Sequence, residues 1–185
     1  LRSCSIPYRI YGGLSFYQRK EIKDIIAYLR LVNNPNDEEA FKRIINYPAR
    51  GIGKTTQEKI QLAAFEHGIS LWAAMAGASE FLPGLNRGTL GKLQTFQALI
   101  EGFRKASDEN SLFDLSVRIV KESGIAADVQ NEPSPENMSK QENIEELLNA
   151  IKTFETEQQE EFGTEKVPLS QYLSQVSLLT DADQR

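Results

Sequence analysis

Only one segment of this 185-residue chain has the pattern of a β-strand, and a single strand cannot bury both of its edges. Residues 6–11 read IPYRIY, in which β-branched and aromatic residues alternate before Gly12-Gly13. Beyond them, apolar residues recur at helical spacing almost to the C-terminus. The sequence therefore predicts a mainly α fold, a helical bundle from residue 34 onward. The preceding strand and helix need a neighbouring sheet, so we expect a piece of a longer protein.

The helix boundaries follow from prolines, glycines and capping residues. A helix over residues 15–33 is expected to end at Asn34-Pro35, because the residue before proline disfavours the α conformation. Thr55-Thr56-Gln57-Glu58 is typical of a capping box, and Gly68 of a C-terminal cap. The two prolines in residues 131–140 predict a loop. The expected helices after the first are about 37–46, 55–67, a short one after Ser70, 89–105, 112–123, 142–160 and one from about 168.

The composition excludes several classes of site. One cysteine, Cys4, leaves no internal disulfide and no Cys-based zinc site, and one histidine, His67, leaves little for a His-rich metal site or a catalytic triad. No apolar stretch approaches the roughly 18 residues of a membrane span. The carboxylates fall on helix faces without a paired, desolvated site. We therefore expect no catalytic residues, no metal site and no membrane partner in this chain.

The charge is distributed unevenly along the sequence. Residues 1–60 contain eleven Lys and Arg and six Asp and Glu. Residues 61–185 contain ten Lys and Arg and twenty Asp and Glu. A polyanion such as nucleic acid would therefore meet the first third of the chain. The acidic second half is typical of solvated helices.

The most informative element is the glycine-rich turn at residues 48–53, between two expected helices. Its glycines allow close approach of a ligand, and one of them can adopt positive φ. The helix that follows would present unpaired amides, a favourable site for one backbone phosphate. Such contacts read no base, so they predict sequence-independent duplex binding. The alternative is a purely structural turn. The candidate duplex-binding residues are Arg50, Gly51, Ile52, Gly53, Lys54, Thr55 and Thr56.

The turn contains a second pattern that is not diagnostic. Gly51-Ile52-Gly53-Lys54-Thr55 ends like a nucleotide-binding phosphate loop. It lacks the earlier glycine of that motif, and a helix rather than a strand leads into it. We interpret the match as accidental.

A longer stretch carries a family resemblance. Residues 6–53, IPYRIYGGLSFYQRKEIKDIIAYLRLVNNPNDEEAFKRIINYPARGIG, resemble superfamily 1 DNA helicases of the UvrD/Rep/PcrA type, from their motif IV into the inserted 2B subdomain. Weaker similarity continues through residues 70–72, 141–147 and 169–179. The positions that match motif IV are Gly12, Gly13, Phe16, Tyr17, Arg19 and Glu21. For Arg19 the resemblance leaves open a place near the nucleotide cleft or a structural role.

The resemblance implies a division of the chain and a function for its parent. Residues 1–34 would be a fragment of the RecA-like 2A domain, and residues 35–185 the helical 2B subdomain, which contacts duplex DNA near a single-strand junction and regulates unwinding. The parent would be an ATP-dependent 3′–5′ helicase of the bacterial cytoplasm that uses ATP and Mg²⁺. The motifs that bind them fall outside this sequence, so the chain alone should bind neither and hydrolyse no ATP.

Two other interpretations stay open at this point. The acidic helices after Gly124 could form a protein-interaction module, with the glycine-rich turn serving only to join two helices. Alternatively, the chain could be the equivalent region of a helicase–nuclease of the RecB or AddA type. Besides DNA, the rest of the helicase chain is the expected partner.

Overall fold

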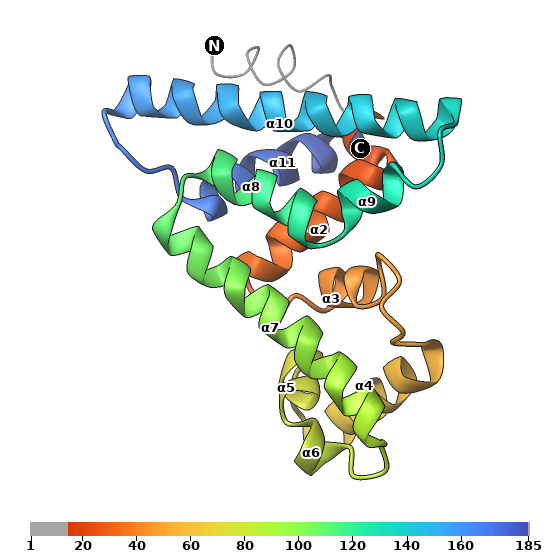
Figure 1. Cartoon of the computed structure of the whole chain (residues 1–185). Coiled ribbons are helices and arrows are strands. Elements are labelled where there is room, and N and C mark those ends of the chain that lie inside the picture. The colour runs from red at the N-terminus through yellow and green to blue at the C-terminus, as the bar shows by residue number, and fades with distance from the viewer. Residues whose placement is uncertain (1–14, 185) are drawn as a thin grey trace.

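The computed structural model describes residues 15–184, which form a short 3₁₀ helix followed by α-helices (Figure 1). No strand occurs among these residues, and the expected strand at 6–11 lies outside them. The elements in order are η1 (Ser15–Gln18), α2 (Lys20–Asn33), α3 (Glu38–Ile44), α4 (Lys54–His67), α5 (Leu71–Ala76), α6 (Ala78–Phe81), α7 (Arg87–Glu109), α8 (Leu112–Glu122), α9 (Ile125–Val129), α10 (Pro135–Phe162) and α11 (Leu169–Gln184).

Helix α2 forms the centre of the bundle. It packs against α3, α7, α8, α10 and α11, and its apolar side chains are buried on every side of the helix. Only Lys20, Lys23 and Asn33 of this helix are exposed, so its neighbours cover most of its surface. Asp24, on the same helix, is also buried, and its carboxylate is paired by Lys20 at 2.6 Å and Arg43 at 2.8 Å. The proposed boundary at residue 34 therefore does not coincide with a break in packing.

Helix α7 connects two groups of helices (Figure 1). Its C-terminal part packs with α8 and α2, close to the long helix α10 that spans the top of the view. Its N-terminal part reaches the lower group, where it packs against α5 near α4 and α6. The turn at residues 48–53 lies between α3, next to the upper group, and α4 in the lower one. The fold thus holds this turn at a junction between the two groups.

Most expected helices are confirmed, with local corrections. Helix α2 ends at Asn33, α4 is closed by Gly68 at φ 64°, and Ser70 caps α5. The expected capping box is wrong: α4 begins at Lys54, with Gly53 as its N-cap and no side-chain cap.

The expected loop at residues 131–140 is also wrong in its second half. Ser134 caps α10 by accepting from the Asn137 amide, and Pro135 occupies the first helical position. Proline is favoured there because its missing N–H has no intrahelical role. The short helices α6 and α9 were not expected from the sequence.

The N-terminus of α8 is satisfied by a buried carboxylate. Glu155 of α10 is 4% exposed and accepts from the amides of Leu112 at 2.8 Å and Phe113 at 3.3 Å. Ser111 accepts from the next amide, that of Asp114. The helix dipole favours a negative charge at this end. Glu155 thereby joins α10 to α8 in the core.

We expect Glu155→Ala to lower the free energy of unfolding by about 2–3 kcal/mol, because it leaves two helix-terminal amides without acceptors in a buried place. Urea denaturation measures this as a lower midpoint at an unchanged slope. Glu160→Ala, at an exposed position of the same helix, is the matched control and should shift stability by less than about 0.5 kcal/mol. Equal midpoints for the two variants would contradict the capping role.

Candidate nucleic-acid interface

The glycine-rich turn is shaped by one asparagine side chain. The Asn46 Oδ1 atom accepts from the amides of Arg50 at 2.9 Å and Ile52 at 3.1 Å. Between them, Gly51 adopts φ 78°, in the left-handed region that favours glycine. The Ile52 side chain is fully buried, and its carbonyl accepts from the Gln57 side chain at 2.9 Å. The turn is therefore a fixed structure that exposes Gly51 and Gly53.

Arg50 is directed into the protein rather than toward solvent. Its guanidinium donates to the carbonyls of Ile44 and Ile45 and, at 2.6 Å, to the hydroxyl of Tyr28. Its central carbon lies 4.9 Å from the centroid of the Phe96 ring. These contacts occupy the fork of the side chain. Arg50 thus anchors the turn to α2, α3 and α7.

The phenol of Tyr28 takes part in this anchor in its neutral form. Burial raises the pKa of Tyr28, and the nearby Arg50 guanidinium only partly opposes that effect. The protonated hydroxyl donates to the Tyr47 carbonyl at 2.6 Å while it accepts from Arg50. Tyr47 in turn donates to Asp128 at 2.8 Å. The base of the turn is therefore linked to α2 and to α9.

The N-terminus of α4 is open. Gly53 precedes it in extended conformation, with φ −77° and ψ 178°, and the first intrahelical bond runs from the Gln57 amide to the Gly53 carbonyl. Within residues 15–184, no group accepts from the amides of Lys54, Thr55 and Thr56. Lys54 and Thr55 are exposed and Thr56 is half-buried. Exposed amides at the positive end of a helix suit an anion.

The fold adds a cation that the sequence analysis missed. A Cβ atom at Gly51 would lie 2.9 Å from the Nζ atom of Lys92, so this lysine of α7 crosses the turn at its glycine. Lys92 is exposed, and no ion pair involves it among the described residues. No local pattern signals this contact, because Gly51 precedes α4 and Lys92 lies in α7, 41 residues later in the chain.

The residues matched to motif IV lie elsewhere in the structure. Phe16 and Tyr17 are buried and pack edge to face at 5.3 Å, while Gly12 and Gly13 fall outside the described residues. Arg19 and Glu21 are bridged by one side chain of α10. Asn143 accepts from Arg19 at 2.9 Å and donates to the buried Glu21 at 2.6 Å. Asn143 belongs to the segment 141–147 that carried weaker resemblance, but its bridging role had no sequence signal.

Comparison with known families identifies the class of protein. The model of the UvrD-like helicase C-terminal domain matches residues 1–185, the whole chain. This chain belongs to the UvrD-like helicase family. The matched residues include the turn, the positions compared with motif IV and α10.

Named relatives within the UvrD-like family agree with this assignment. DNA helicase II of Haemophilus influenzae is 38% identical over 98% of the chain, and ATP-dependent DNA helicase PcrA of Bacillus subtilis is 37% identical over all of it. DNA helicase II of Escherichia coli is 34% identical over 96%. The chain spans 24% of the length of each of these relatives. It therefore corresponds to about a quarter of a helicase of this family.

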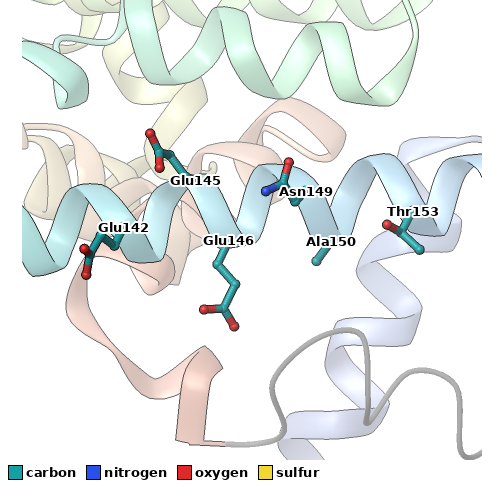
Figure 2. Close-up of a pocket in the computed structure, with 6 residues that line it drawn as sticks. All are labelled: Glu142, Glu145, Glu146, Asn149, Ala150 and Thr153. Atoms are coloured by element: carbon teal, nitrogen blue, oxygen red, sulfur yellow. The ribbon is translucent and has the colours of Figure 1, made fainter.

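The acidic face of α10 in this UvrD-like region has no cluster of converging side chains that resembles the turn before α4. A shallow hollow along α10 is lined by Glu142, Glu145, Glu146 and three neighbours on the same helix, and Figure 2 shows their side chains diverging. Among residues 15–184, no group of His, Cys, Asp and Glu side chains could hold a metal ion. Nor is any helix there long and apolar enough to cross a membrane.

We expect Arg50→Lys to lower the free energy of unfolding of this UvrD-like domain by about 1–3 kcal/mol, because an ammonium cannot replace a fork that serves two carbonyls and a hydroxyl. Thermal or urea denaturation measures the change. Arg118→Lys is the control, since Arg118 is exposed and its guanidinium pairs only with Glu122 among the described residues. If both variants were equally stable, Arg50 would not anchor the turn.

Proposed function

We propose that this chain is the helical 2B subdomain of an ATP-dependent 3′–5′ DNA helicase, together with the motif IV part of its 2A domain, divided near residue 34. The observation that carries the proposal is the family match across the whole chain, combined with the exposed turn at Gly51-Ile52-Gly53, here called the GIG element, and the uncapped start of α4 that follows it. The subdomain binds duplex DNA without sequence preference near a single-strand junction. It thereby regulates unwinding rather than driving it.

ATP hydrolysis belongs to the complete protein in this proposal. The relatives, which are named as DNA helicases, are about four times as long as this chain. The parent uses ATP and Mg²⁺ at its motor domains, and the present chain supplies duplex contact beside them. Tethering to a motor that already holds the DNA raises the effective concentration of a weak site.

Two sets of residues contribute to the duplex contact: one fixes the shape of the turn, and the other contacts the DNA. Arg50 and the buried Ile52 side chain fix the turn from within. Gly51, Gly53, Lys54, Thr55 and Thr56 form the contacting surface: glycines that let the DNA backbone approach, main-chain amides that donate to a phosphate, and a lysine that adds charge.

The test is binding of the chain to a short duplex with a 3′ single-stranded tail, followed by fluorescence anisotropy. We expect a Kd of about 10⁻⁴–10⁻⁶ M that weakens steeply between about 50 and 200 mM salt, because released counterions drive phosphate contacts. Lys54→Ala should weaken binding to all sequences alike and lower the salt slope by about 0.9. Lys121→Ala, an exposed lysine on α8, is the control. Binding that ignores salt, or that is unchanged in Lys54→Ala, would refute the role of the turn.

A second prediction separates the helix amides from the lysine. At Gly53 the backbone angles suit any residue, and a Cβ atom there would have no neighbour within 4 Å. Gly53→Asn should therefore supply a side-chain cap that raises stability by a few tenths of a kcal/mol. The same cap occupies an amide needed by the phosphate, so DNA binding should weaken. Gly53→Ala lacks the cap and serves as the control; tighter or equal binding by Gly53→Asn would show that the amides are not used.

A further inference from the structure

The GIG element has a cationic neighbour on a different helix. Lys92 of α7 lies over Gly51, and a Cβ atom at that glycine would be 2.9, 3.1 and 3.2 Å from its Nζ, Cε and Cδ atoms. The lysine stem can follow the turn this closely only because Gly51 has no side chain. Gly51 therefore serves two purposes, the left-handed backbone and the passage of Lys92.

The position of Lys92 is held by the same contacts that hold the turn. Four residues later on α7, on the same face of the helix, Phe96 is fully buried under the Arg50 guanidinium. Arg50 is in turn bonded to Tyr28 and to the carbonyls at the end of α3. The turn and this part of α7 are thus parts of one packed unit. The packing of Phe96 against Arg50 therefore places the backbone of Lys92 beside the turn.

The ammonium of Lys92 has no acidic partner among the described residues. No carboxylate pairs with it within residues 15–184, whereas Lys20, Arg43, Arg118 and Lys140 all have acidic partners there. The nearby residue Gly91 has open space around it, so this side of α7 is accessible beside the lysine. An exposed, unpaired cation next to a phosphate-binding turn adds to the local attraction for a polyanion.

We propose that Lys92 is a second phosphate-binding residue of the GIG element and that duplex DNA is held by α7 as well as by the turn and α4. The inference rests on the proposed function of the turn. Each DNA strand carries one phosphate per about 3.4 Å of helix axis, so Lys92 and Lys54 can neutralise separate phosphates near the turn. The interface then includes two helices, α4 and α7, with a cation from each.

The decisive variant is Lys92→Met, which keeps most of the side chain that packs over Gly51 and removes only the ammonium. We expect an unchanged unfolding midpoint, a three- to tenfold weaker Kd for the tailed duplex at about 0.1 M salt, and a salt slope lower by about 0.9. Lys105→Met is the matched control: it is exposed on the same helix, about 20 Å further along the axis, and should bind like the wild type. Lys92→Arg should retain the wild-type slope.

A double-mutant cycle assigns the contact to a phosphate. Neutral methylphosphonate linkages are placed one at a time along the duplex and tested against the wild type and Lys92→Met. We expect one linkage that weakens the wild type but has little further effect on Lys92→Met, and a different linkage that behaves this way with Lys54→Ala.

The outcomes separate the two claims. If the wild type binds in a salt-dependent way and Lys54→Ala weakens it, but Lys92→Met matches the wild type in Kd and slope, the role of Lys92 is wrong while the proposed function of the turn stands. If Lys92→Met and Lys92→Arg lose stability or affinity equally, Lys92 is a structural residue and the inference is also overturned. If the wild type shows no salt-dependent binding, the proposed function itself fails.

Discussion

The guanidinium of Arg50 joins the parts of the molecule that make up the candidate site. It donates to the end of α3 through two carbonyls, to α2 through the Tyr28 hydroxyl, and it covers the Phe96 ring of α7. A planar fork can satisfy several acceptors at fixed angles, which a lysine cannot. Because the residue that follows is Gly51, any movement of Arg50 would move the exposed turn and its position relative to Lys92. The exposed surface therefore depends on an interaction that DNA would not touch.

The start of α4 lacks a side-chain cap, as do the starts of α2, α6 and α9, whereas five other helices have one. Side chains accept from first-turn amides at α3, α5, α7, α8 and α10, the caps being Asp37, Ser70, Asn86, Ser111 and Ser134. At α4 a glycine stands in the cap position and the amides face solvent. A glycine in place of such a cap costs a helix only about a few tenths of a kcal/mol. An anion that binds these amides would recover part of that free energy, so ligand binding and local stability are linked at this helix.

Local signals in the sequence were sufficient for most helix ends but not for the site. Asn34-Pro35, Gly68 and Ser70 act on their immediate neighbours, and the helix boundary that each predicts is confirmed. The capping box predicted at Thr55 is wrong because threonine is favoured at N-caps, whereas Gly53 in extended conformation already allows the helix to begin at Lys54. The same limit applies to Pro135, a residue typical of loops that is also favoured at the first position of a helix.

What the sequence could not predict are contacts between distant residues. The exposed turn was found from glycines and flanking charges, but Arg50 was expected at the DNA surface and instead reaches inward to Tyr28, 22 residues away. Lys92 and Asn143 gave no signal, since their roles arise only when α7 meets the turn and α10 meets the start of α2. Helical periodicity identifies which face of a helix is apolar. It does not determine which polar side chains of two such helices come together.

Helix α2 connects the two ends of this arrangement. At its start, Arg19 and Glu21 are bridged to α10 by Asn143, and further along Tyr28 receives the hydrogen bond of Arg50. Both contacts are made by one continuous buried helix, and packed cores shift between discrete arrangements rather than bending gradually. Under the proposed division near residue 34, all of α2 belongs to the 2A fragment and the turn belongs to the 2B subdomain. The hydrogen bond between Arg50 and Tyr28 therefore joins the two proposed parts across their boundary.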